Sequence, residues 1–178
     1  MTLSMASIPP APARPRPLAH RPGALAIGSS TGGPQALTEV LRNLRVASSL
    51  PVFITQHMPA AFTGVLAEQI SRQTPWPCRQ AEEGDVVEGG QCYLAPGGRH
   101  MVARMASGQI RLALEDTPPE NFCRPAVDPM LRSLISLYGR RLLVLILTGM
   151  GKEGLEGCRA VRDAGGQIVA QDEASSAV

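Results

Sequence analysis

The chain has 178 residues, of which 44% are hydrophobic and only 3% aromatic, so it can bury one core built mostly of aliphatic side chains. Its formal net charge is +2, and no basic patch with interleaved aromatic residues occurs, which argues against nucleic-acid binding. No apolar run is long enough to span a bilayer, and prolines and arginines stand where a signal peptide would be apolar. We therefore expect a cytoplasmic protein without direct membrane insertion.

The first 23 residues are rich in proline, alanine and arginine. Because proline disfavours helices and the interior of sheets, residues 1–23 are predicted to form a flexible, extended segment. We expect a single folded domain over residues 24–178.

A candidate nucleophile stands at the first predicted turn of this domain. Residues 24–27 predict a short buried strand, and residues 35–44 carry helical spacing. The turn between them fits G-x-S-x-G around Ser30. Flanking glycines let the backbone bend sharply and lift the hydroxyl above the sheet edge, and free N–H groups of the helix start can hold a developing oxyanion. The pattern is short, so a plain turn or a phosphate cradle is an alternative.

A second strand and helix are predicted at residues 51–55 and 60–73, with His57 between them. Two strand–helix units in succession indicate a parallel sheet with right-handed crossovers, in which ligands bind beyond the carboxyl ends of the strands. Ser30 and His57 both follow their strands directly, so we expect them at the same edge of the sheet. A lone histidine is more often structural, but beside a candidate nucleophile His57 is a candidate general base.

Residues 74–115 are punctuated by glycines. Their last two apolar segments, 100–105 and 109–114, are separated by a glycine-containing turn and predict an antiparallel hairpin at one edge of the sheet. His100 at the base of this hairpin is the rival candidate for the general base, although its strand-like surroundings favour a structural role.

The last third of the domain supplies a candidate carboxylate. A helix is predicted over 125–139, followed by the wholly apolar strand 142–147, which we expect to be central and buried on both faces. A second glycine-rich turn then holds Glu153, before a helix to about residue 164 and a final strand at 167–170.

Three strand ends therefore carry Ser30, His57 and Glu153. Ester hydrolysis by serine needs a base for the hydroxyl proton and a carboxylate that orients the base. The order Ser, His, Glu departs from the Ser, Asp/Glu, His order of α/β-hydrolases, so we do not expect simply that fold. Glu153 is alternatively a helix-start acid favoured by the helix dipole, which is compatible with the catalytic role.

The four cysteines, in contrast, indicate neither a metal site nor a disulfide framework. No two are spaced as C-x-x-C, and none has a histidine beside it in the sequence. We expect reduced, mostly buried thiols, and the sequence implies no metal and no cofactor.

Six ordered motifs closely resemble the bacterial chemotaxis protein-glutamate methylesterase family, CheB: IGSSTGG at 27–33, QHMP at 56–59, LAPGGRH at 94–100, RPAVD at 124–128, LTGMG at 147–151 and QDEASSAV at 171–178. The resemblance implies an α/β fold with a doubly wound, mostly parallel sheet. It implies hydrolysis of glutamate γ-methyl esters on methylated chemoreceptor signalling helices, and deamidation of certain receptor glutamines. By position, Ser30 would be the nucleophile and His57 the general base, and the oxyanion and substrate contacts would fall near Thr31 and Met150.

The chain departs from the family pattern in three places. The family usually has aspartate where this chain has Glu153, whose side chain is one methylene longer. It usually carries an N-terminal receiver domain, so we expect its control to be missing or supplied by a separate response-regulator receiver. It also continues beyond residue 178 into a closing helix, so we expect the domain to be C-terminally short.

Two other functions stay open at this point. The chain could be a non-catalytic CheB-like interaction module, if Glu153 and the short C-terminus have cost it activity. It could also bind a nucleotide or phosphate through residues 28–33, at a helix start. The absence of the G-x-x-x-x-G-K-[ST] lysine and of the G-x-G-x-x-G spacing disfavours the latter.

Overall fold

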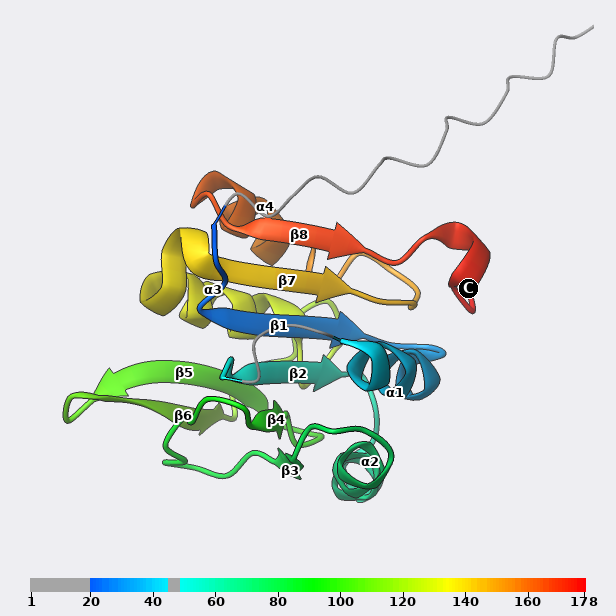
Figure 1. The fold of residues 1–178 in the computed structure, drawn as a ribbon, viewed down its shortest axis with the longest axis horizontal. Coiled ribbons are helices and arrows are strands. Elements are labelled where there is room, and N and C mark those ends of the chain that lie inside the picture. Colours follow the sequence, from blue (N-terminus) through cyan, green and yellow to red (C-terminus); the bar gives the residue numbers. More distant parts are fainter. Residues whose placement is uncertain (1–19, 45–48) are drawn as a thin grey trace, which may run out of the picture.

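The computed structural model describes residues 20–44 and 49–178, so most of the predicted flexible segment 1–23 lies outside the described residues. The main sheet has six strands in the order β3-β4-β2-β1-β7-β8, and every neighbouring pair is parallel (Figure 1). Its strands are β1 (Ala24–Ser29), β2 (Val52–Gln56), β3 (Cys78–Gln80), β4 (Cys92–Leu94), β7 (Leu142–Ile146) and β8 (Gln167–Ala170).

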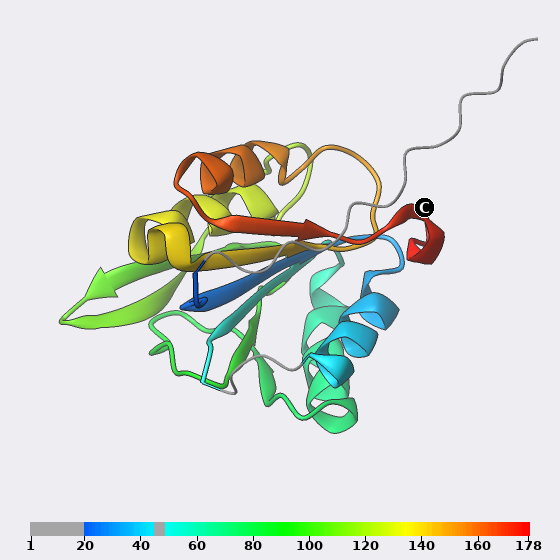
Figure 2. The same cartoon turned by 45° about the horizontal axis from the view of Figure 1, so that its top comes forward.

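Helices cover both faces of the sheet, which confirms the predicted doubly wound α/β fold (Figure 2). They are α1 (Gly33–Asn43), α2 (Ala60–Gln73), α3 (Val127–Tyr138) and α4 (Leu155–Asp163). Alternate residues of β1 enter two separate cores: Leu25 and Ile27 pack with α1 and α2, whereas Ala24 and Ala26 pack with α3 and α4. This alternation follows from the two-residue period of a strand.

The predicted antiparallel hairpin is present as β5 (His100–Ala106) and β6 (Gln109–Glu115). It forms a sheet of its own and packs along α3, where the hydroxyl of Ser133 accepts a hydrogen bond from the N–H of Ala103 at 3.0 Å. The edge of the main sheet on that side is β3, which the sequence analysis did not predict. A strand of three residues is too short to show a period.

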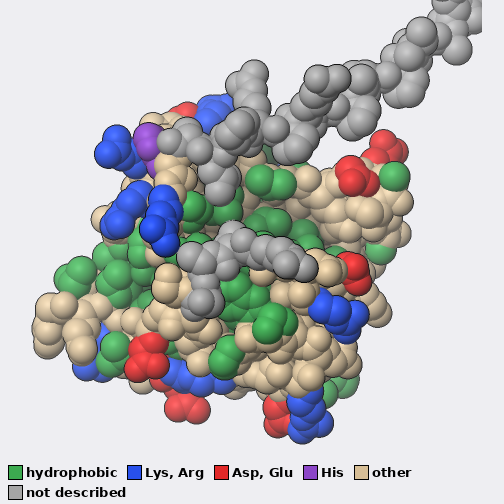
Figure 3. All heavy atoms as spheres, in the orientation of Figure 1, with side chains coloured by type: hydrophobic (Ala, Val, Ile, Leu, Met, Phe, Trp, Pro, Cys, Tyr) green, Lys and Arg blue, Asp and Glu red, His purple; other side chains and the backbone are tan. Residues whose placement is uncertain are grey.

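The apolar strand β7 is internal, but β1 and β2 occupy the middle of the sheet. Only its first three residues are buried, because its neighbour β8 is an edge strand whose Ile168 and Val169 are 37% and 49% exposed. On the face drawn in Figure 3, hydrophobic side chains reach the surface in the middle, basic side chains gather at the upper left, and acidic and basic side chains are mixed along the lower edge.

The topology fixes where the functional residues meet. The strands β2, β1 and β7 are neighbours and parallel, so the loops that follow them leave the sheet at the same edge, on the right in Figure 1. Ser30, His57 and Glu153 lie on these three loops. Among the helices of the described residues, none has the length and apolar character needed to cross a membrane.

Candidate active site

The turn that carries Ser30 is fixed by its own backbone. The N–H of Ser30 donates to the carbonyl of Thr148 at 3.0 Å, and the N–H of Gly33 donates back to the carbonyl of Ser30 at 2.8 Å. Gly32 has a φ of +78°, and a Cβ there would lie 2.4 Å from Cβ of Ala177. Only glycine fits such a position, so the chain turns directly from β1 into α1. The helix α1 starts at Gly33, two residues before the predicted residue 35, and Pro34 lies in its first turn, where proline is tolerated.

Two further contacts hold Ser30 in place. Gln56, which is 2% exposed, donates from Nε2 to the carbonyl of Ser30 at 2.8 Å and accepts a hydrogen bond from the Ser29 hydroxyl at 2.7 Å. From the second glycine-rich turn, Gly149 approaches so closely that a Cβ there would lie 2.7 Å from Cβ of Ser30. Gln56 is a positioning residue that the sequence analysis missed, because nothing in the sequence shows which way its side chain points.

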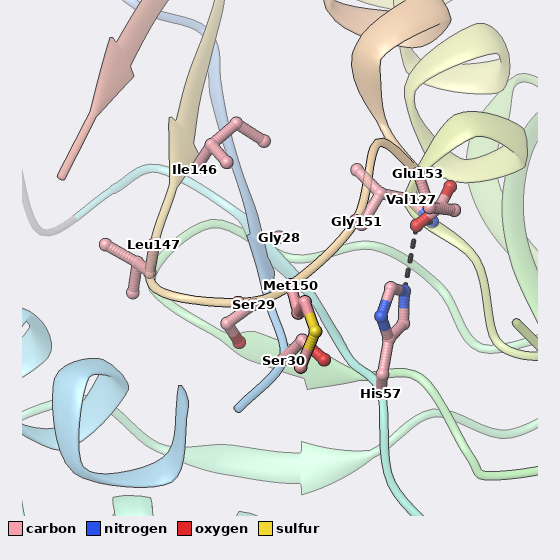
Figure 4. Close-up of a pocket in the computed structure, with 11 residues that line it drawn as sticks. Gly28, Ser29, Ser30, His57, Val127, Ile146, Leu147, Met150, Gly151 and Glu153 are labelled. Carbon is pink, nitrogen blue, oxygen red and sulfur yellow. Dashed lines mark hydrogen bonds and ion pairs between the residues drawn. The ribbon is translucent and has the colours of Figure 1, made fainter. Parts of the chain in front are cut away.

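His57 and Glu153 form a direct pair. Nε2 of His57 lies 2.8 Å from Oε2 of Glu153, and their side chains are 18% and 4% exposed. Because a carboxylate only accepts hydrogen bonds, the neutral imidazole carries its proton on Nε2. Nδ1 is then the basic nitrogen, and it faces the side of the cavity where Ser30 and Met150 lie (Figure 4).

Glu153 is held at the start of α3. Its Oε2 accepts the N–H of Val127 at 2.9 Å, and its Oε1 accepts the N–H of Asp128 at 2.8 Å. Burial alone would raise the pKa of Glu153, but the hydrogen bonds from His57 and from these two N–H groups outweigh it and lower the pKa below its ordinary value. The carboxylate is therefore charged at neutral pH, as a partner for an imidazolium must be.

This lowered pKa predicts a pH-dependent contribution to stability. The charged form of Glu153 stabilises the folded state fully above the unfolded-state pKa, about 4.3 for glutamate, and this stabilisation is lost as the pH falls through the lower folded-state pKa. In urea denaturation, Glu153→Gln should lower the free energy of unfolding by about 1 to 3 kcal/mol at pH 7 and by clearly less near pH 3. Glu156→Gln, at an exposed position of α4, is the matched control and should change little at either pH. An equal loss at both pH values would contradict the role of the charge.

One cavity unites most of the predicted site residues. Ser30, His57, Glu153 and Met150 all line it, and Met150 is also 76% exposed (Figure 4). Thr31 is exposed and is not among the lining residues. The full lining comprises Gly28, Ser29, Ser30, His57, Val127, Ile146, Leu147, Gly149, Met150, Gly151 and Glu153.

His100, the rival base, has a structural environment, as its strand pattern favoured. It is fully buried, its Nδ1 accepts the N–H of Ala126 at 3.1 Å, and its Nε2 lies 3.1 Å from the carbonyl of Pro118. Both ring nitrogens are therefore engaged by the backbone, and neither is available to a substrate. His100 instead holds the loop that leads into α3, where Glu153 is bound.

Cys123 is a site residue that the sequence analysis missed. Its Sγ lies 3.6 Å from Nδ1 of His57, although 66 positions separate the two residues. Burial, with a smaller effect of the Glu153 charge, raises the pKa of the thiol, which is thus protonated at neutral pH. All four cysteines are free; Cys78 and Cys92 are buried as expected, whereas Cys123 and Cys158 are only partly buried.

Comparisons with known proteins show the family of this chain. The family model of the CheB methylesterase matches residues 25–178. A protein-glutamate methylesterase/protein-glutamine glutaminase from Azospirillum brasilense is 52% identical, over 96% of this chain and 45% of its own length. A group 2 operon protein of the same name from Rhodospirillum centenum is 53% identical, over 95% of this chain and 43% of its own length. The chain thus spans about half the length of these curated relatives.

The fold also matches a solved structure. The crystal structure of the Thermotoga maritima CheB methylesterase catalytic domain aligns with a TM-score of 0.84 and 34% sequence identity, covering 89% of this chain and 84% of that one.

Proposed function

Because the chain belongs to the CheB methylesterase family, we propose that it is a serine hydrolase that removes methyl esters from glutamate side chains of chemoreceptor-like proteins. The observation that carries the proposal is the buried Glu153 carboxylate on Nε2 of His57, in the cavity that Ser30 also lines. Relatives that share about half of its residues are named for this activity.

In the proposed acylation step, Nδ1 of His57 takes the proton from the Ser30 hydroxyl while Oγ attacks the ester carbonyl. The imidazolium that forms is stabilised by the charged Glu153 on the opposite side of the ring. It then returns the proton to the methoxy oxygen, the C–O bond breaks, and methanol leaves an acyl-enzyme on Ser30. Water, activated in turn by His57, attacks this ester and releases the glutamate carboxylate.

Developing negative charge on the carbonyl oxygen needs nearby donors. We assign this role to backbone N–H groups at Thr31, directly after the nucleophile, and near Met150 on the opposite turn. A backbone donor is consistent with the exposed side chain of Thr31. The same steps applied to a glutamine side chain would release ammonia, so we propose protein-glutamine deamidation as a second activity; the names of the two relatives reported above include protein-glutamine glutaminase.

The proposal extends to location and control. Methylated signalling helices of chemoreceptors would be the substrates, which places the enzyme in the cytoplasm, and a separate response-regulator receiver would control it. The alternative, a non-catalytic interaction module, leaves the geometry of the site unexplained. Binding alone requires neither a buried carboxylate on the histidine nor two backbone N–H groups that fix this carboxylate.

A fluorophosphonate probe tests the nucleophile, because it reacts covalently with serines that an adjacent base activates. We expect one equivalent of label, mapped by peptide mass spectrometry to Ser30, and none in Ser30→Ala. Ser136→Ala, at an exposed serine of α3, is the control and should label as the unmodified chain does. Absence of label on the folded chain would favour the interaction module.

A further inference from the structure

A large apolar side chain stands fully in solvent beside the candidate active site. Phe122 is 102% exposed, the highest value among the exposed large hydrophobic residues. Its neighbour Cys123 touches Nδ1 of His57 at 3.6 Å. Phe122 therefore projects from the segment that borders the proposed general base.

The backbone under Phe122 is strained. Glu120 and Cys123 exchange two hydrogen bonds, from the N–H of Glu120 at 3.1 Å and from the N–H of Cys123 at 2.9 Å. The two residues between them have positive φ, +46° at Asn121 and +67° at Phe122. Positive φ at both central positions defines a type I′ turn, in which Asn-Gly is strongly preferred. Asn121 fits its position, but a bulky residue at the second position costs free energy.

The turn is also anchored at both ends, so the ring is held away from the protein. The carboxylate of Glu120 accepts a hydrogen bond from Nη1 of Arg132 on α3 at 2.9 Å and a second from Nη2, and Cys123 contacts His57. A phenyl ring that is exposed and strained on an anchored turn contributes nothing to the core, which points to a contact outside the chain.

The cavity indicates what this contact is. Phe122 is not among its lining residues, so a small methyl ester bound beside Ser30 and His57 would not reach the ring. A protein segment that presents a modified glutamate to Ser30 and His57 is larger than the cavity and also contacts the surface around His57, next to which Cys123 and the exposed Phe122 lie.

We propose that Phe122 is a specificity-determining contact that packs against an apolar side chain flanking the modified glutamate of the protein substrate. This proposal rests on the proposed function. It implies that the chain keeps a strained residue for substrate recognition, and that recognition and chemistry can be separated by one substitution.

Phe122→Gly tests it, with methyl-esterified chemoreceptor protein and p-nitrophenyl acetate as the two substrates. We expect kcat/KM for the protein to fall at least about tenfold, mainly through KM, since burying a phenyl ring at an interface contributes this much or more. Hydrolysis of p-nitrophenyl acetate should stay within about twofold, because no step of the chemistry changes. The thermal midpoint should rise, because glycine relieves the strain.

Two variants serve as controls. Phe122→Tyr keeps an aromatic ring and should retain most of the kcat/KM for the protein. Met105→Ala removes another exposed apolar side chain, which is 61% exposed near the far end of the β5–β6 hairpin. It should leave kcat/KM unchanged for both substrates.

An unchanged KM for the protein in Phe122→Gly would overturn the proposal. So would an equal loss on both substrates, which would place the ring in the chemistry, or a wild-type dimer that Phe122→Gly converts to a monomer, which would identify a second copy as the partner. Failure of the proposed function is distinguishable, because the unmodified chain would then release no methanol from the methyl-esterified protein, whether or not it hydrolysed p-nitrophenyl acetate.

Discussion

Replacing Ser30 with alanine should reduce the turnover of methyl-esterified protein by about three to six orders of magnitude, as loss of the nucleophile does in other serine hydrolases. The fold should survive, because the turn between β1 and α1 is held by the backbone of Ser30 and not by its hydroxyl. The N–H of Ser30 donates to the carbonyl of Thr148, and the carbonyl of Ser30 accepts from Gly33 and Gln56. Methanol release measures the turnover, and circular dichroism checks the fold.

The matched control for this experiment is Ser136→Ala, which removes a hydroxyl of the same kind from the exposed side of α3. It should retain the full rate. A Ser30→Ala protein that is folded and nearly as active as the unmodified chain would exclude Ser30 from the mechanism.

Replacing Glu153 with glutamine should lower the turnover by about two to four orders of magnitude, as loss of the triad carboxylate does elsewhere. The physical reason is that the Glu153 carboxylate accepts three hydrogen bonds, more than a glutamine amide oxygen and NH₂ group can match. Glu153 accepts from Nε2 of His57 and from the N–H groups of Val127 and Asp128. Glutamine offers one oxygen and an NH₂ group, so at least one of these donors would face another donor. The histidine would lose both its orientation and the charge that stabilises the imidazolium.

Glu153→Asp separates charge from reach. Aspartate keeps the negative charge but is shorter by one methylene, so it should be more active than Glu153→Gln. Steady-state methanol release from both variants measures the difference. If Glu153→Gln were as active as the unmodified chain, the carboxylate of the catalytic triad would have to be sought among other acids. Two of the rival acids are engaged elsewhere: Asp163 pairs with Arg162 at the end of α4, and Asp172 accepts the N–H of Ser175 after β8.

Local patterns predicted most of the fold. The helical period over residues 60–73 gave α2 without a change of boundary, and the final strand at 167–170 is also unchanged. The strand β1 runs two residues further than predicted, to Ser29, because Gly28 and Ser29 pair with Thr55 and Gln56 of β2. Such pairing depends on a neighbour far along the chain, which a local period does not show.

The same distinction holds for the site. Ser30, His57 and Glu153 could be predicted to converge because parallel strands end at one edge of a sheet. Cys123 and Phe122 could not, because the loop before α3 is brought to His57 by contacts such as the hydrogen bond from Ala126 to the buried His100. Sequence spacing carries no record of such loop contacts.

The most direct test of the account is the fate of the methyl group. A chemoreceptor protein carrying isotopically labelled methyl esters on its glutamates should release labelled methanol when mixed with the 178-residue chain, in proportion to enzyme, while free carboxylates return at the same glutamates. If the folded chain, shown by fluorophosphonate to have a reactive Ser30, released no methanol from this substrate, the assignment as a protein-glutamate methylesterase would be contradicted.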